Sequence, residues 1–139
     1  MCGTFRRGLE ATLTGHEGTV CALVVEGRRL YSSSKDKTIR MWDAGTWAEW
    51  RSVAVYDANE AGQCPACLLT SGSKLISGSA YAFPYDDSAE QVVRVWDLDT
   101  LACEHTVRQE PGADVRCLAG AGGAVWGGVG QTAVVWERD

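Results

Sequence analysis

Residues 15–43 read GHEGTVCALVVEGRRLYSSSKDKTIRMWD, and this stretch decides the fold. It contains three short runs that are rich in β-branched and aliphatic residues: 19–25, 29–33 and 38–42. Glycine or charged residues separate the runs, and no helical period competes with them. Short runs of this kind, divided by turn residues, predict an antiparallel meander of strands.

The same stretch carries polar landmarks: Gly15-His16 at its start, Ser32 on the second run, Asp36 in the next turn and Trp42-Asp43 at its end. With the strand pattern, these residues resemble a WD repeat, the unit that forms one blade of a β-propeller. The resemblance implies that His16, Ser32, Asp36 and Trp42 form a buried hydrogen-bonded chain, which stabilises a fold only when every member is paired. A catalytic pair of His16 and Asp36 is the alternative. We favour the structural role, because the blade itself would use both side chains.

Weaker copies of this unit fill the rest of the chain. Blade one is expected at about 15–55, blade two at about 64–107 and blade three at about 114–136. Trp96-Asp97 and Trp136-Glu137 stand where blade one has Trp42-Asp43. Blade two has no Gly-His pair, and Glu90 replaces the turn aspartate, so we expect it not to form the same polar chain. Blade three is rich in glycine, which weakens strand preference, and we expect it to be the least stable.

The predicted fold is therefore all-β: one domain, residues 1–139, that forms a partial WD-repeat β-propeller of about three four-stranded antiparallel blades. Residues 9–13 read as a strand and are expected to close blade three. Propellers typically need four to eight blades to complete a ring. We therefore expect further blades, either from a longer parent protein whose C-terminal part is this chain or, less favoured, from a second copy.

Composition narrows the class. The chain carries a formal net charge of −5, which argues against a general nucleic-acid binder. No apolar run approaches the length that spans a bilayer, and residues 1–15 lack the apolar stretch of a signal peptide, so we expect no membrane association and a cytoplasmic or nuclear location. Cys64-Pro-Ala-Cys67 has the spacing of a zinc or redox motif, but no second pair accompanies it. We expect buried thiols there, and neither a metal nor a cofactor.

The resemblance implies a non-catalytic protein–protein interaction scaffold, with other proteins as its partners. Two alternatives stay open: an RNA-binding propeller and the substrate-recognition part of a larger ubiquitin-ligase-type protein. The first is supported by the basic residues Arg28, Arg29, Lys35 and Lys37.

The candidate partner-binding residues are Tyr81, Phe83 and Tyr85, which alternate along an insertion, residues 80–90, between two strands of blade two. Extra residues between paired strands must leave the sheet, and aromatic side chains are enriched at interface cores. An equally weighted alternative is that the three rings fold back over the neighbouring blade.

Overall fold

A computed structural model describes residues 11–55, 63–81, 91–109, 115–121, 124–129 and 132–137. All regular structure within these ranges is β-strand, and every pairing is antiparallel between strands that follow one another in sequence. The described residues contain no helix with the length and apolar character needed to cross a membrane. The predicted all-β fold class is confirmed.

Blade one is a four-stranded sheet with strand order β1-β2-β3-β4, and its strands are β1 Val20–Glu26, β2 Arg29–Ser34, β3 Thr38–Asp43 and β4 Glu49–Ala54. The β1–β2 hairpin turns at Gly27, whose φ of 61° lies in the left-handed region that glycine adopts without strain. Gly72, with a φ of 59°, fills the equivalent turn of the next sheet. The two hairpins therefore share one local geometry.

The other two sheets repeat this order. Blade two contains β5 Gln63–Ser71, β6 Lys74–Tyr81, β7 Gln91–Asp97 and β8 Cys103–Gln109. Blade three contains β9 Val115–Ala121, β10 Ala124–Val129 and β11 Thr132–Glu137, and it has three strands within the described residues. Residues 11–13 of the predicted closing strand 9–13 form no strand; the rest of that segment lies outside the described residues.

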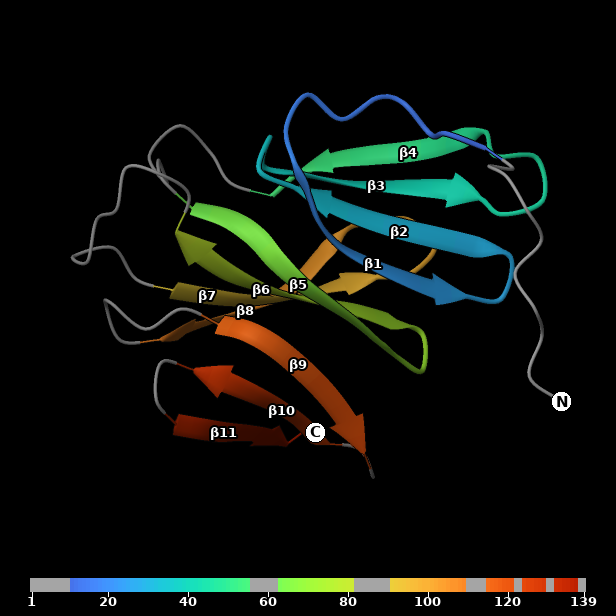
Figure 1. Cartoon of the computed structure of the whole chain (residues 1–139). Helices are drawn as coiled ribbons and strands as arrows, with labels where there is room; N and C mark the ends of the chain where they lie inside the picture. The colour runs from blue at the N-terminus through green and yellow to red at the C-terminus, as the bar shows by residue number, and fades with distance from the viewer. Residues whose placement is uncertain are drawn as a thin grey trace, which may run out of the picture.

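The three sheets pack face to face in chain order (Figure 1), with blade one at the top, blade two in the middle and blade three at the bottom. The first strand of each sheet contacts the first strand of its neighbour, so that β5 lies between β1 and β9. β5 also packs against β2 and β3, and β9 packs against β6 and β7. This arrangement, with the first strands innermost and the later strands outward, is that of propeller blades.

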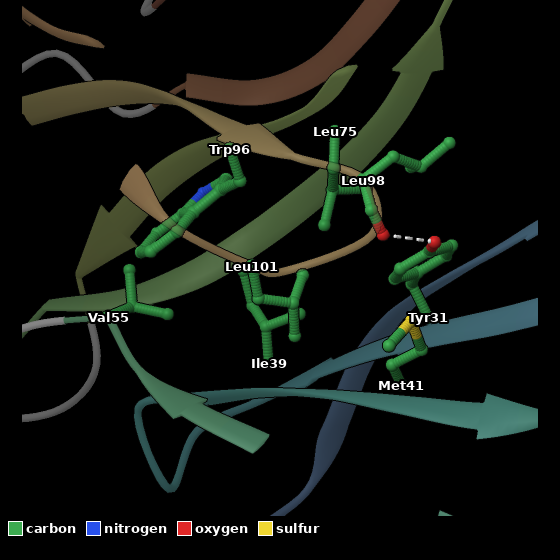
Figure 2. Close-up of a cluster of buried hydrophobic side chains, with 8 residues drawn as sticks. All are labelled: Tyr31, Ile39, Met41, Val55, Leu75, Trp96, Leu98 and Leu101. Carbon is green, nitrogen blue, oxygen red and sulfur yellow. Dashed lines mark hydrogen bonds between the residues drawn. The ribbon is translucent and has the colours of Figure 1, made fainter. Parts of the chain in front are cut away.

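The main core lies between blades one and two (Figure 2). Its buried members from blade one come from two strands and the residue after β4, and those from blade two come from β6, β7 and the turn that follows β7. They are Tyr31, Ile39, Met41, Val55, Leu75, Trp96, Leu98 and Leu101. A second cluster between blades two and three contains Cys67, Ile76, Val93 and Val125. Burial of apolar surface between sheets is therefore what holds consecutive blades together.

Polar contacts supplement the apolar packing between blades one and two. The Tyr31 hydroxyl donates a 2.7 Å hydrogen bond to the Leu98 carbonyl, which Figure 2 shows. Arg29 forms an ion pair with Asp99 in the same turn, and Arg94 donates to the Val55 carbonyl. Directional bonds of this kind fix the relative placement of the two sheets, which apolar contacts alone leave less defined.

The insertion in blade two begins later than predicted. Ala80 and Tyr81 continue β6, where they pair with Cys64 and Gln63 of β5. β5 and β6 are therefore longer than their counterparts in blade one, and part of the extra sequence extends the sheet instead of leaving it. Residues 82–90, which include the candidate side chains Phe83 and Tyr85, lie outside the described residues.

Candidate functional site

The structure brings His16, Ser32, Asp36 and Trp42 together in one hydrogen-bonded chain. Trp42 Nε1 lies 2.9 Å from Ser32 Oγ, Ser32 Oγ lies 2.6 Å from His16 Nε2, and His16 Nδ1 lies 3.0 Å from Asp36 Oδ2. β2 carries Ser32 and β3 carries Trp42, while the segment before β1 and the β2–β3 turn supply His16 and Asp36. The chain therefore ties the N-terminal connection of blade one to its two central strands.

The pattern of donors assigns the tautomer of His16. Asp36 is an acceptor, so the proton lies on Nδ1 and Nε2 accepts from the Ser32 hydroxyl. Ser32 Oγ in turn accepts from the indole of Trp42, which can only donate. Each group thus acts in one direction, from the indole to the carboxylate.

Asp36 is the most heavily hydrogen-bonded member. Its oxygens accept from the backbone N–H of Glu17 at 2.9 Å and of Thr38 at 2.9 Å, and from the Thr38 hydroxyl at 2.6 Å, besides His16. Burial by itself raises the pKa of this carboxyl, but the hydrogen bonds, led by the Thr38 hydroxyl, outweigh it and hold the pKa well below its ordinary value. The side chain is therefore an anion at neutral pH.

Gly18 allows the connection to approach Asp36 this closely. A Cβ atom at Gly18 would lie 2.8 Å from the Asp36 backbone nitrogen, a separation that real side chains do not adopt. Sequence reasoning missed both this role and that of Thr38. The Asp-x-Thr spacing of residues 36–38 is the signal that would have indicated Thr38, because a hydroxyl two residues after an aspartate commonly bonds to it.

Ser32, His16 and Asp36 are connected in the same order as the serine, histidine and aspartate of a hydrolytic triad. Their setting prevents that chemistry. Ser32 is 3% exposed, and its oxygen already accepts the indole N–H of Trp42. His16 uses both ring nitrogens, and its side chain is 6% exposed. A substrate carbonyl cannot reach the Ser32 hydroxyl, so the three residues have a structural role in blade one.

Blade two retains the tryptophan and serine members of this polar chain. Trp96 Nε1 donates to Ser77 Oγ at 3.0 Å, and both residues are about as deeply buried as Trp42 and Ser32. The positions that correspond to His16 and Asp36, Ala61 and Glu90, lie outside the described residues. The bond between indole and serine therefore recurs in blade two, while the absence of the full polar chain there stays a prediction.

The aspartate that follows each of these tryptophans shapes the next turn. Asp43 Oδ1 accepts from the N–H groups of Gly45 and Thr46, and these bonds hold the pKa of Asp43 below its ordinary value. Asp97 accepts in the same way, from Thr100 and Asp99, and its pKa is lowered too. Both turns bring one apolar residue into a left-handed conformation: Trp47 with a φ of 64° and Leu101 with a φ of 58°.

The candidate partner-binding residues are only partly placed. Of Tyr81, Phe83 and Tyr85, Tyr81 belongs to the end of β6, and the other two lie outside the described residues. Whether these rings bind a partner therefore stays a prediction. Two other aromatic side chains, Trp47 and Trp50, are 41% and 49% exposed, and the Arg29 guanidinium lies 5.2 Å from the ring centroid of Trp50.

The cysteines show no metal or disulfide chemistry where their side chains are described. Cys21, Cys67 and Cys103 are not in disulfides, and Cys67 is buried in the cluster between blades two and three. Cys64 and Cys67 both lie on β5, where Cys67 pairs with Gly78. Across the described ranges, no group of three or more potential metal ligands comes together.

Comparison with known proteins identifies the first repeat. Residues 7–43 match the family model described as WD domain, G-beta repeat. Zinc finger CCCH domain-containing protein 17 of Oryza sativa subsp. japonica is 58% identical over 36 residues, or 26% of this chain and 8% of that protein. Zinc finger CCCH domain-containing protein 62 of Arabidopsis thaliana is 54% identical over 35 residues, or 25% of this chain and 8% of that protein. The chain thus spans a small part of the relatives that it matches.

A solved structure supports the fold. The chain superimposes on a europium-containing methanol dehydrogenase with a TM-score of 0.54 and 17% identity, over 62% of this chain and 14% of that one. That protein is a β-propeller, and at this identity the similarity concerns the fold alone. Residues 7–43 therefore match a WD, G-beta repeat, and the antiparallel sheets of the chain have the form of β-propeller blades.

Proposed function

We propose that this chain is a non-catalytic module that binds other proteins, built from WD repeats. The observation that carries the proposal is that the polar chain of blade one is fully used within the blade. His16, Ser32 and Asp36, which have the residue types of a hydrolytic site, are paired with one another and largely buried. WD repeats generally mediate contacts between proteins, and loops on a rigid scaffold are where recognition concentrates.

The candidate contact residues in this proposal are Tyr81, Phe83 and Tyr85, on and after the end of β6. The end of β6 is held by its pairing with β5, and aromatic side chains on a fixed backbone supply contact area at low entropic cost. To test the proposal, all three are replaced by serine, and partner capture from lysate and the urea unfolding midpoint are compared with those of the unaltered chain. We expect loss of captured proteins at an unchanged midpoint.

The matched control is Trp50→Ser, which removes an exposed aromatic ring from β4 instead. The control is expected to retain the captured proteins. A lower unfolding midpoint for the triple variant, with capture unchanged, would show that the rings cover the sheet and contact no partner.

RNA is the second candidate ligand, because the hairpin turns of blade one carry basic side chains. Arg28 follows Gly27 at the β1–β2 turn, and Lys35 and Lys37 flank Asp36 at the β2–β3 turn. Binding through phosphates weakens steeply between about 50 mM and about 200 mM salt. Fluorescence anisotropy with a labelled single-stranded RNA is expected to show no binding across this range. Salt-dependent binding that disappears when Arg28, Lys35 and Lys37 are changed to glutamine would contradict the proposal.

A further inference from the structure

One face of blade one carries exposed apolar side chains in an ordered pattern. Val20, Leu23 and Val25 of β1 are 46%, 62% and 62% exposed. They pair with Ser34, Ser32 and Leu30, which are alternate residues of β2 and therefore share one face of the sheet. Together with Trp47, which is 41% exposed, these side chains define what we call the open face of blade one: Val20, Leu23, Val25 and Trp47.

The equivalent face of blade two is covered. Pro65 and Leu68 pair with Ser79 and Ser77 of β6, as Val20 and Leu23 pair with the matching serines of β2. Pro65 is fully buried, and Leu68 packs against the core between blades one and two.

The turns after β3 and β7 repeat the contrast. Leu101, the left-handed residue of the turn after β7, is 4% exposed and belongs to that same core. Trp47 has the same backbone conformation in the turn after β3, yet 41% of it is exposed. Positions that are buried where another blade lies over them are thus exposed at the open face of blade one.

The outer face of blade three corresponds to the faces of blades one and two that carry Met41 and Val95. Val135 of β11 occupies the position of Met41 on β3 and Val95 on β7, as the strand pairings show. Met41 is 1% exposed beneath blade two, and Val95 packs in the cluster beneath blade three. Val135 is 44% exposed. Each described contact between blades joins the face of one blade that corresponds to the open face to the opposite face of its neighbour. Val20, Leu23, Val25 and Trp47 on blade one and Val135 on blade three stay exposed among the described residues.

Arginine side chains repeat the same contrast. Arg94 of blade two reaches across and donates to the Val55 carbonyl of blade one. Arg40 holds the equivalent position on β3 and instead pairs with Glu49 of its own blade, at 2.5 Å. At the open face of blade one, the arginine that corresponds to the inter-blade Arg94 is therefore paired within its own blade.

We propose that two copies of this chain associate head to tail, with the open face of blade one of each copy packed on the Val135 face of blade three of the other. This inference is independent of the proposed protein-binding function. Two such contacts are related by a twofold axis and use the same two surfaces, so they continue the contacts already present within each copy. Two copies of three blades give six, which lies within the range that propellers use to close.

The test uses sedimentation velocity on the full 139-residue chain over a range of concentrations. The unaltered chain is expected to sediment as a dimer. Leu23→Asp and Val135→Asp each place a charge on one of the two faces, and each variant alone is expected to sediment as a monomer. Val107→Asp is the matched control, because Val107 is an exposed valine, at 36%, on the outer strand of blade two. It is expected to remain a dimer.

Mixing the two variants tests the head-to-tail arrangement directly. Leu23→Asp keeps an intact blade-three face and Val135→Asp keeps an intact blade-one face, so an equimolar mixture regains one good contact. A dimer is expected to reappear in the mixture at the higher concentrations. The proposal is overturned by a monomeric unaltered chain, by a dimer that either variant leaves intact, by a mixture that stays monomeric, or by a trimer or an open series of larger species.

Discussion

Replacing Trp42 by phenylalanine tests the polar chain at its most buried link. The substitution removes the indole N–H that lies 2.9 Å from Ser32 Oγ, in a place where Trp42 and Ser32 are 4% and 3% exposed. Water has little access to restore the missing donor, so the hydrogen-bonding capacity of Ser32 is left partly unused. The expected loss is about 1–3 kcal/mol in the free energy of unfolding, the usual result of an unsatisfied buried group.

Phenylalanine is also smaller than tryptophan, and a double-mutant cycle separates the two effects. Ser32→Ala leaves Trp42 Nε1 and His16 Nε2 without partners, so it is expected to cost at least as much as Trp42→Phe. In the Ser32→Ala background the indole N–H already lacks a partner, so Trp42→Phe reports the change in ring size together with the relief of that unpaired donor. The coupling between the two changes is expected to be about 1 kcal/mol.

The assay is urea unfolding at one fixed protein concentration, because association of the chain would make its apparent stability depend on concentration. Equal slopes of unfolding free energy against urea are required for the four proteins of the cycle. Additivity within about 0.5 kcal/mol would refute the reasoning, since residues joined by a buried hydrogen bond should be coupled more strongly than that.

Three further outcomes follow from the same contacts. The pKa of Asp36 is lowered by folding, so its stabilising effect is complete above the unfolded pKa of about 3.9 and is lost as the pH falls toward the folded value. Asp36→Asn should therefore flatten the plot of unfolding free energy against pH below about pH 4. An unchanged plot in that range would argue against a stabilising role for the Asp36 carboxylate. Tyr31→Phe should lower the free energy of unfolding in urea by about 0.5–1.5 kcal/mol, because it removes the buried hydrogen bond to the Leu98 carbonyl. Arg29→Ala should lower it by less, because the partner carboxylate of Asp99 is 71% exposed. A larger loss for Arg29→Ala than for Tyr31→Phe would be inconsistent with this account. Ser77→Ala should destabilise by about 1–3 kcal/mol, because Trp96 Nε1 then has no acceptor, and a melting temperature equal to that of the unaltered chain would contradict this.

The strands of blade one could be read from the sequence almost to the residue. Runs at 19–25, 29–33 and 38–42 correspond to β1, β2 and β3, because alternation of apolar and polar residues and glycine or charged turns act locally. The outer strand β4 begins at Glu49, a boundary that the sequence pattern does not mark. The preceding turn takes Trp47 into a left-handed conformation that its side chain gives no reason to expect.

The polar chain could be expected from the sequence, and the contacts between blades could not. His16, Ser32, Asp36 and Trp42 lie within one repeat, and the resemblance of that repeat to a WD repeat implied their connection. Tyr31 and Leu98 belong to different repeats, and their contact depends on how two sheets pack. No local pattern encodes that packing.

The insertion of blade two shows the same limit. An excess of residues relative to blade one predicted a loop from residue 80, but an antiparallel pair can also lengthen when both strands gain residues together. β5 and β6 do this, as the pairing of Gln63 with Tyr81 shows. A register comparison between the two blades was needed to distinguish a longer hairpin from a longer loop.

The position of blade two between two neighbours determines how the molecule comes apart. Within a single copy, the contacts between described strands of different sheets join consecutive sheets, as in other repeat proteins, so opening an end sheet breaks one set of these contacts and opening the middle sheet breaks two. Amide hydrogen exchange should therefore be slowest in β5, β6 and β7 and faster toward both ends of the stack. Transient separation of an end sheet would uncover the apolar residues of blade two, so brief openings, long before global unfolding, are the moments at which this chain is most exposed to aggregation or proteolysis.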